Sequence, residues 1–174
     1  MISPTIQKAL NDQIALEARA SFLYLSMSVW CDAQGLEGCC KFMQRQSEEE
    51  RMHMLKIFHY MSEVDALAIT PAIDQVPVEF DSVKSMFEQV YAHEQKVSAS
   101  IHNLVALSVQ ERDHNTDNFL QWFVEEQREE EALMRTILDK IKLIGDGPQS
   151  LYYIDKEVSA INDQAIKEAA AEKA

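Results

Sequence analysis

The sequence feature that most constrains the fold is a glutamate and a histidine, Glu50 and His53, on the apolar face of a long helical pattern. Between Phe42 and Val64 the residues of this face, here called the seam of the helix, recur at steps of four and three. This is the spacing of a helix that buries one face in a bundle. Burying an unpaired carboxylate costs several kcal/mol. This face therefore requires a partner that its own helix does not supply, and a metal ion is the simplest one.

Three further segments carry the same pattern, and each has polar residues within its apolar seam. The seams run over residues 6–27, 42–64, 83–108 and 119–144. With only four glycines and four prolines in 174 residues, these periodic segments predict an all-α chain folded as a four-helix bundle. Ser3 is the expected N-cap of the first helix, with Pro4 at its first position, and Gly35 marks the turn into the second helix.

The segment 65–81 interrupts the helical pattern. Pro71 and Pro77 exclude a continuous helix there. Extended at about 3.3 Å per residue, the segment could reach on the order of 50 Å, which is longer than the helix before it. We interpret it as a crossover that runs the length of the bundle and makes the second and third helices parallel.

The end of the chain is predicted to add a short fifth helix that begins near Ser150. Residues 165–174 consist largely of Ala, Glu and Lys without a strong apolar anchor, and we expect them to form a disordered tail. The sequence thus predicts a single bundle domain over residues 1–164.

Charge and cysteine content restrict the partners and the compartment. The formal net charge is −13 and the isoelectric point is about 4.7, which argues against a nucleic-acid surface, because phosphate binding requires clustered Lys and Arg. No apolar run reaches the roughly 18 residues of a membrane span, and the N-terminus lacks the features of a signal peptide. Three crowded cysteines, Cys31, Cys39 and Cys40, do not form a disulfide framework. We expect a cytoplasmic protein.

The polar residues of the four seams are expected to meet at one level. Glu17 and Glu50 are equidistant from the first turn, and Glu94 and the pair Gln127–Glu130 are equidistant from a turn near residues 111 and 112. Folding each hairpin antiparallel brings its sites to the same height. The predicted constellation consists of Glu17, Glu50, His53, Glu94, Gln127 and Glu130. Oxygen ligands with one imidazole suit cations such as Fe(II) or Mn(II).

Several motifs along the chain resemble a known family. They are Asn11-Asp12-Gln13, Ser26-Met27-Ser28-Val29-Trp30, Glu49-Glu50 with His53, His93-Glu94-Gln95, Phe119-Leu120-Gln121-Trp122, Glu126-Gln127, Glu129-Glu130-Glu131, and the run from Leu151 to Glu157. Together with the Glu-x-x-His bundle pattern, this combination resembles the non-haem bacterial ferritins over nearly the whole chain.

The resemblance implies a ferroxidase centre that oxidises Fe(II) with O2. Glu17, Glu50 and His53 would bind one iron, with Glu50 bridging. The second iron would be bound by Glu94 with Gln127 or Glu130. A third iron site next to them would use Glu49, Glu126 and Glu129. Tyr24 matches a tyrosine close to the centre that could hydrogen-bond or donate an electron.

Two departures distinguish the chain from the haem-binding bacterioferritins. Those proteins carry a second Glu-x-x-His on the fourth helix, where this chain has Gln127-x-x-Glu130, and a haem-ligating Met after the bridging glutamate, where Arg51 stands here. We therefore expect no haem. The resemblance also implies iron storage, with Fe(II) and O2 or peroxide as substrates, in a 24-subunit homo-oligomeric cage.

Two other functions remain possible at this point. A di-iron oxidase or peroxide-scavenging bundle without storage would use the same ligands but would be a dimer or smaller. A non-catalytic interaction bundle would use the seam acids only to fix helix register, and its stability would not respond to divalent metals.

Some of the residues near these motifs also have ordinary structural explanations. Tyr24 could be a hydrogen-bonded core tyrosine. Within the acidic run, Glu125 and Glu131 are expected to face solvent. The cysteines could bind a soft metal, although small buried thiols are far more common. The remaining histidines are expected on the surface: His59, His93, His102 and His114.

Overall fold

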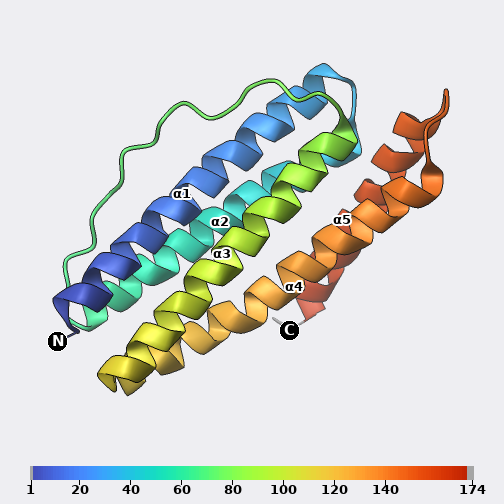
Figure 1. Cartoon of the computed structure of the whole chain (residues 1–174). Helices are drawn as coiled ribbons and strands as arrows, with labels where there is room; N and C mark the ends of the chain where they lie inside the picture. Colours follow the sequence, from blue (N-terminus) through green and yellow to red (C-terminus); the bar gives the residue numbers. More distant parts are fainter. Residues whose placement is uncertain (1, 172–174) are drawn as a thin grey trace.

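The computed structural model describes residues 2–171 and is all-α (Figure 1). The helices are α1 (Pro4–Ala33), α2 (Glu37–Glu63), α3 (Val83–Glu111), α4 (His114–Ile144) and α5 (Ser150–Ala171). The first four form two antiparallel hairpins packed side by side, with α5 placed along α4 and α2 at one end (Figure 1). The predicted four-helix bundle with an additional C-terminal helix is confirmed.

The long link between α2 and α3 crosses the full length of the bundle over α1 (Figure 1). Asn11 of α1 makes two hydrogen bonds to the beginning of this link. Its side-chain amide donates to Leu67 O at 3.1 Å, and Ile69 N donates to Asn11 Oδ1 at 2.7 Å. Near its end, Ser26 Oγ donates to Pro77 O at 2.6 Å. The two helices α2 and α3 are parallel, as the crossover predicted.

Side-chain caps and a glycine turn set the helix boundaries. Ser3 Oγ accepts from Ile6 N at 3.1 Å with Pro4 in the first turn, as expected of an N-cap. The serine before α3 and the aspartate before α4 cap those helices in the same way. Gly35 has a φ of 74°, a left-handed conformation that favours glycine and ends α1.

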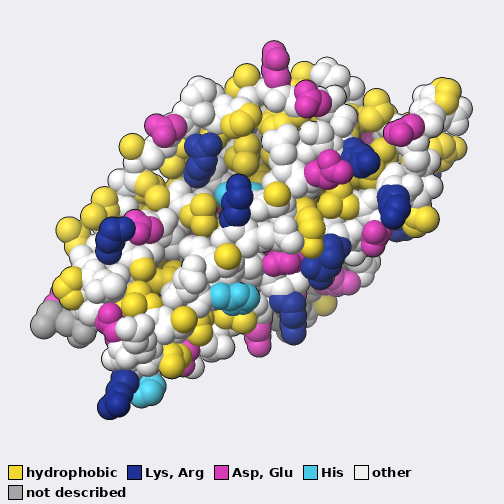
Figure 2. Space-filling view, viewed as in Figure 1, with side chains coloured by type: hydrophobic (Ala, Val, Ile, Leu, Met, Phe, Trp, Pro, Cys, Tyr) yellow, Lys and Arg dark blue, Asp and Glu magenta, His cyan; other side chains and the backbone are white. Residues whose placement is uncertain are grey.

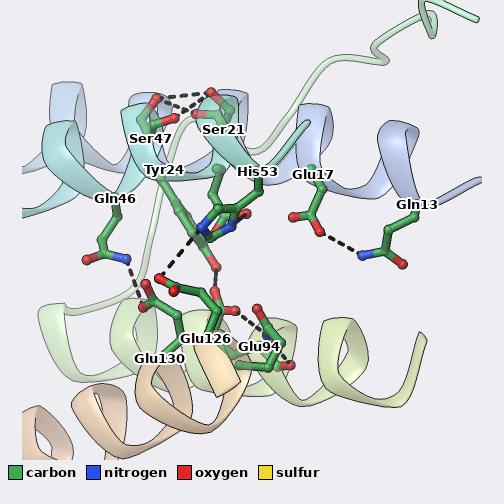
Figure 3. Close-up of polar contacts among 12 residues, drawn as sticks. Gln13, Glu17, Ser21, Tyr24, Gln46, Ser47, His53, Glu94, Glu126 and Glu130 are labelled. Atoms are coloured by element: carbon green, nitrogen blue, oxygen red, sulfur yellow. Dashed lines mark hydrogen bonds and ion pairs between the residues drawn. The ribbon is translucent and has the colours of Figure 1, made fainter. Parts of the chain in front are cut away.

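The helices α1 and α2 approach each other closely near their middle. Ser21 Oγ donates to Ser47 O at 2.7 Å, and Ser47 Oγ donates back to Ser21 O at 2.8 Å (Figure 3). Small side chains at both positions allow this reciprocal pairing. It fixes the register of the hairpin, so that Glu17 of α1 and Glu50 of α2 lie at the same level.

The interior consists of two apolar clusters with a polar layer between them. One cluster, at the Gly35 end, is built around Met27, Phe42 and Phe87, and the other, at the opposite end, around Leu10 and Phe123. Between them lie buried polar side chains from all four long helices: Gln13, Glu17, Gln46, Glu50, His53, Glu94, Gln127 and Glu130. The predicted convergence of the seam residues at one level is therefore present in the fold.

The helix α5 docks on the N-terminal end of α2. Asp155 accepts hydrogen bonds from Gly38 N at 3.1 Å and from Cys39 N at 2.8 Å, which satisfies two free N–H groups of the first turn of α2. The helix extends further than predicted, because residues 165–171 are helical. Ala, Glu and Lys have high helix propensity and propagate a helix that has already formed. Residues 172–174 of the expected tail lie outside the described residues.

The surface mixes charges of both signs. On the face shown in Figure 2, Lys and Arg side chains are interspersed with Asp and Glu, and the described residues form no continuous basic patch there. Within residues 2–171, none of the helices has an apolar stretch of the length needed to cross a membrane.

Gly38 supplies the first testable prediction. A Cβ at this position would lie 2.3 Å from Asp155 O and 2.9 Å from Ser159 Cβ, so Gly38→Ala must push α5 away from α2. We expect a loss of about 1–3 kcal/mol in the free energy of unfolding, measured by urea denaturation. Gly147→Ala is the matched control, since its Cβ would meet only Ser150 Oγ at 3.5 Å. Equal stability of the two variants would contradict the close packing of α5.

Candidate metal centre

Three side chains of the first hairpin converge inside the bundle. Glu17 comes from α1, and Glu50 and His53 from α2, and one ligand atom of each lies within 4.8 Å of those of the other two. All three side chains are buried. The side chains of Glu17 and His53 point away from their own helices toward α3 and α4, where Glu94, Glu126 and Glu130 face them (Figure 3). The first half of the predicted constellation is thus assembled.

The second hairpin supplies the other half. Glu94 of α3 and Gln127 and Glu130 of α4 are all buried. Gln127 Nε2 donates to Glu94 Oε2 at 3.1 Å across the hairpin. The hydroxyl of Tyr24, from α1, donates to Glu94 Oε1, so this tyrosine joins the two hairpins at the level of the centre (Figure 3).

Three glutamine amides each donate to one of the buried carboxylates. Gln13 Nε2 donates to Glu17 Oε1 at 2.7 Å, and Gln46 Nε2 donates to Glu130 Oε2 at 3.0 Å. The third pair is the Gln127–Glu94 contact described above. An amide is a neutral donor, so it orients a carboxylate without neutralising its charge. The amide of Gln13 is itself oriented by Ser100, whose Oγ donates to Gln13 Oε1 at 2.5 Å.

Several ligand atoms have no hydrogen-bond partner among the described residues. These buried atoms are Glu17 Oε2, both carboxylate oxygens of Glu50, Glu49 Oε2, and both ring nitrogens of His53. Orphaned buried polar atoms are rare, because each costs about 1–3 kcal/mol or more. Here Glu17, Glu50 and His53 converge on one place and offer carboxyl oxygens and an imidazole. This donor set fits a divalent cation such as iron.

The electrostatics of the centre also favour a cation. Burial, with Glu50 as the next contributor, raises the pKa of Glu17 well above its usual range, and burial together with Glu94 raises the pKa of Glu50. Burial and repulsion from Glu94 and Glu49 raise the pKa of Glu130 to about 8. A cation bound among these groups would displace their protons, because metal ligands must be deprotonated.

His53 lies in a partly aromatic environment beside further acids. Burial alone would lower its pKa, but the nearby carboxylates of Glu126 and Glu17 outweigh burial and raise it. Its Nε2 lies 3.8 Å from Glu126 Oε1, too far for a hydrogen bond. The rings of Trp122 and Phe123 stand edge-on to the imidazole, with centroids 5.4 Å and 6.1 Å away.

Of the three residues predicted for a third site, two lie at the edge of the centre and one faces outward. Glu49 and Glu126 are partly buried at the edge of the centre, with side chains 26% and 27% exposed. Glu129 is 69% exposed, and its Oε1 lies 3.4 Å from Arg128 Nη2. Among the described residues, no polar contact joins Glu129 to the buried cluster. On α4 it follows Glu126 by three positions but faces outward.

One of the histidines expected on the surface is not there. His93 is mostly buried, its Nε2 has no partner among the described residues, and its ring stands edge-on to Tyr24 with centroids 6.0 Å apart. Burial, with Lys96 and Arg19 nearby, lowers its pKa to about 4. The surface prediction for His93 was wrong because the residue after it, Glu94, lies in the seam, and α1 covers the edge of that seam. His59, His102 and His114 are exposed, as predicted.

The residues that support the ligands were not predicted from the sequence. Gln13 and Trp122 were named only within the motifs of the resemblance, and Gln46 was not named. The signal for the two glutamines was their position one helical turn before Glu17 and Glu50. The three cysteines are free and buried, as expected of structural thiols. The hydrogen bond with Cys31, followed by burial, raises the pKa of Cys39.

A family model describes the same region of the chain. Residues 7–144, which include the four long helices except for the first residues of α1, and the crossover, match the ferritin-like domain. The chain belongs to the ferritin-like family. The match spans every helix that contributes a residue to the centre.

Named relatives of this family share most of their length with the chain. A probable bacterial non-heme ferritin-like protein of Haemophilus influenzae is 43% identical over 95% of this chain and 100% of that protein. The bacterial non-heme ferritin of Escherichia coli O6:H1 is 37% identical over 94% and 99% of the two chains. Among solved structures, an open pore ferritin from Archaeoglobus fulgidus is 44% identical with a TM-score of 0.88, covering 91% of this chain and 96% of that one.

The raised pKa of Glu130 yields a prediction for the metal-free protein. The folded state holds this proton up to about pH 8, whereas the unfolded state loses it near pH 4.3. The contribution of protonated Glu130 to the free energy of unfolding is fully present below the pKa of the unfolded state. It is lost as the pH rises through the pKa of the folded state. We therefore expect chelator-treated protein to lose about 2 kcal/mol of unfolding free energy from this group between pH 6 and pH 8.

Urea denaturation at the two pH values measures this loss, with Glu130→Gln as the comparison. The glutamine keeps the shape and can still accept from Gln46, but it does not titrate. The variant should show a smaller loss between pH 6 and pH 8 than the wild type. The same loss in both proteins would show that Glu130 is not protonated in the folded state.

Proposed function

We propose that this chain is an iron-storage ferritin with ferroxidase activity. The observation that carries the proposal is the convergence of four buried carboxylates, one imidazole and one amide from four helices at one level. Several of their ligand atoms have no hydrogen-bond partner within residues 2–171. The bacterial non-heme ferritin relatives support iron as the metal. Two Fe(II) ions are the substrates: each gives one electron to dioxygen and becomes Fe(III), and the dioxygen, with two protons from water, becomes hydrogen peroxide.

We assign the ligands according to the two halves of the centre. Glu17, Glu50 and His53 bind the first iron, and Glu50 bridges because neither of its oxygens has a hydrogen-bond partner among the described residues. Glu94 binds the second iron with Gln127 or Glu130. The carboxylates offset the charge that increases on oxidation to Fe(III). Tyr24, which donates to Glu94, orients this ligand.

A third iron would bind at the edge of the centre. Glu49 and Glu126 are half-buried beside His53 and support this site. Glu129 would have to turn from its position beside Arg128 to take part. The three residues together would hold an ion on its way to or from the pair.

We also propose that the protein stores its product in a homo-oligomeric cage of 24 subunits. The stripe of Phe22, Leu25 and Val29 on α1 is exposed on one face of the helix, and α5 exposes Leu151 and Tyr152. Exposed apolar patches of this kind mark contacts with other chains.

The free thiols support a cytoplasmic location. Residues 1–164 remain the proposed domain.

Loss of the bridging carboxylate tests the activity. Glu50→Gln removes the charge but keeps the shape, and we expect the initial rate of Fe(II) oxidation in air to fall at least about tenfold. The near-ultraviolet absorbance of the ferric product reports the rate. Glu125→Gln, a substitution of an exposed acid on α4, should retain the wild-type rate. An unchanged rate in Glu50→Gln would contradict the proposed centre.

The neutral ligand Gln127 yields a separate prediction. Because a carboxylate holds Fe(III) more tightly than an amide, Gln127→Glu should slow the release of product. The first pair of irons would then oxidise at a rate close to the wild type, and later additions would oxidise several-fold more slowly. Successive additions of two Fe(II) per subunit measure this difference. Equal rates on all additions would show that release does not depend on this residue.

A further inference from the structure

Arg45 joins α5 to the edge of the metal centre. Its Nε donates to Asn162 Oδ1 of α5 at 2.7 Å, its Nη2 donates to Gln46 Oε1 at 2.9 Å, and its Nη1 donates to Glu49 Oε1. The guanidinium also lies over the Phe42 ring, 5.4 Å from the centroid. All three nitrogens are therefore engaged, and the planar group has one orientation.

This orientation determines how Gln46 faces the centre. Because the carbonyl oxygen of Gln46 accepts from Arg45, its amide nitrogen is directed the other way, where it donates to Glu130 Oε2 at 3.0 Å. Without Arg45 the amide could reverse and present an oxygen to the carboxylate. The arginine thus selects the arrangement in which Glu130 receives a hydrogen bond.

The same guanidinium leaves Glu49 as a one-oxygen ligand. Its Oε1 accepts from Arg45 Nη1, while its Oε2 is buried without a hydrogen-bond partner among the described residues. A single oxygen is therefore available to a cation at the edge of the centre. Asn162 holds the arginine in this position and is itself 95% buried, with 5% exposed, on the face of α5 that contacts α2.

We propose that Asn162, acting through Arg45, is a positioning residue for the second half of the metal centre. Through the hydrogen bond between Asn162 and Arg45, α5 sets the orientation of Gln46, Glu130 and Glu49, and so the affinity for the second and any third metal. The first metal, bound by residues that Arg45 does not contact, is independent of α5. This inference rests on the proposed function, since it presupposes that the two halves of the centre bind separate ions.

Asn162→Ala tests the inference because it removes the acceptor for Arg45 Nε. Zn(II) is a suitable probe because it does not undergo oxidation, and calorimetric titration resolves its successive binding steps. We expect the affinity of the tighter step to remain within about twofold of the wild type and that of the weaker step to fall about three- to tenfold. Losses of this size do not exceed those typical of residues that support metal ligands.

Three further variants separate positioning from simple packing. Asn162→Asp keeps the acceptor oxygen and should restore the second step. Arg45→Lys keeps the charge but cannot make three directed hydrogen bonds, so it should reproduce the selective loss without altering α5. Val158→Ala removes a buried side chain of the same face of α5. It should lower the melting temperature and leave both Zn(II) steps unchanged.

The outcomes are distinct. Selective weakening of the second step in Asn162→Ala and Arg45→Lys, with rescue in Asn162→Asp, would support the inference. Unchanged binding in Asn162→Ala, equal weakening of both steps, or the same loss in Val158→Ala would overturn it. A wild-type protein that binds fewer than two Zn(II) per subunit would instead contradict the proposed centre itself, and the inference with it.

Discussion

The structure depends on a layer of buried carboxylates that divides the apolar core in two. Glu17, Glu50, Glu94 and Glu130 lie within the bundle, where an isolated charge is unfavourable. The apolar clusters on either side of the layer supply the hydrophobic stabilisation that keeps it in place. Such a layer is retained in a fold only if something compensates for it, and a bound cation is the compensation that its geometry fits.

The protein satisfies these carboxylates only in part. Glutamine amides and the Tyr24 hydroxyl occupy one oxygen each of Glu17 and Glu130 and both oxygens of Glu94, yet both oxygens of Glu50 and both nitrogens of His53 have no partner among the described residues. Neutral donors orient the ligands without cancelling their charge. The arrangement gives up stability in the metal-free state and keeps a rigid set of donors for a cation.

Helix periodicity predicted much of the centre because a helix is regular: a residue in the seam stays in the core, and its height follows from the distance to the turn. Residues at the edge of a seam were less predictable. His93 is covered by α1 and Glu129 faces solvent, although each lies one position from a seam residue. The contact of Arg45 with Asn162 joins residues 117 positions apart. It depends on the docking of α5 at Gly38, for which periodicity offers no signal.

The central claim is that the two halves of the buried layer bind a pair of metal ions. Anomalous diffraction from crystals soaked in Mn(II) measures this directly, because each ion gives its own peak. The account predicts two peaks within one subunit, one among Glu17, Glu50 and His53 and one beside Glu94 and Glu130. Peaks confined to surface carboxylates, with none inside the bundle, would contradict it.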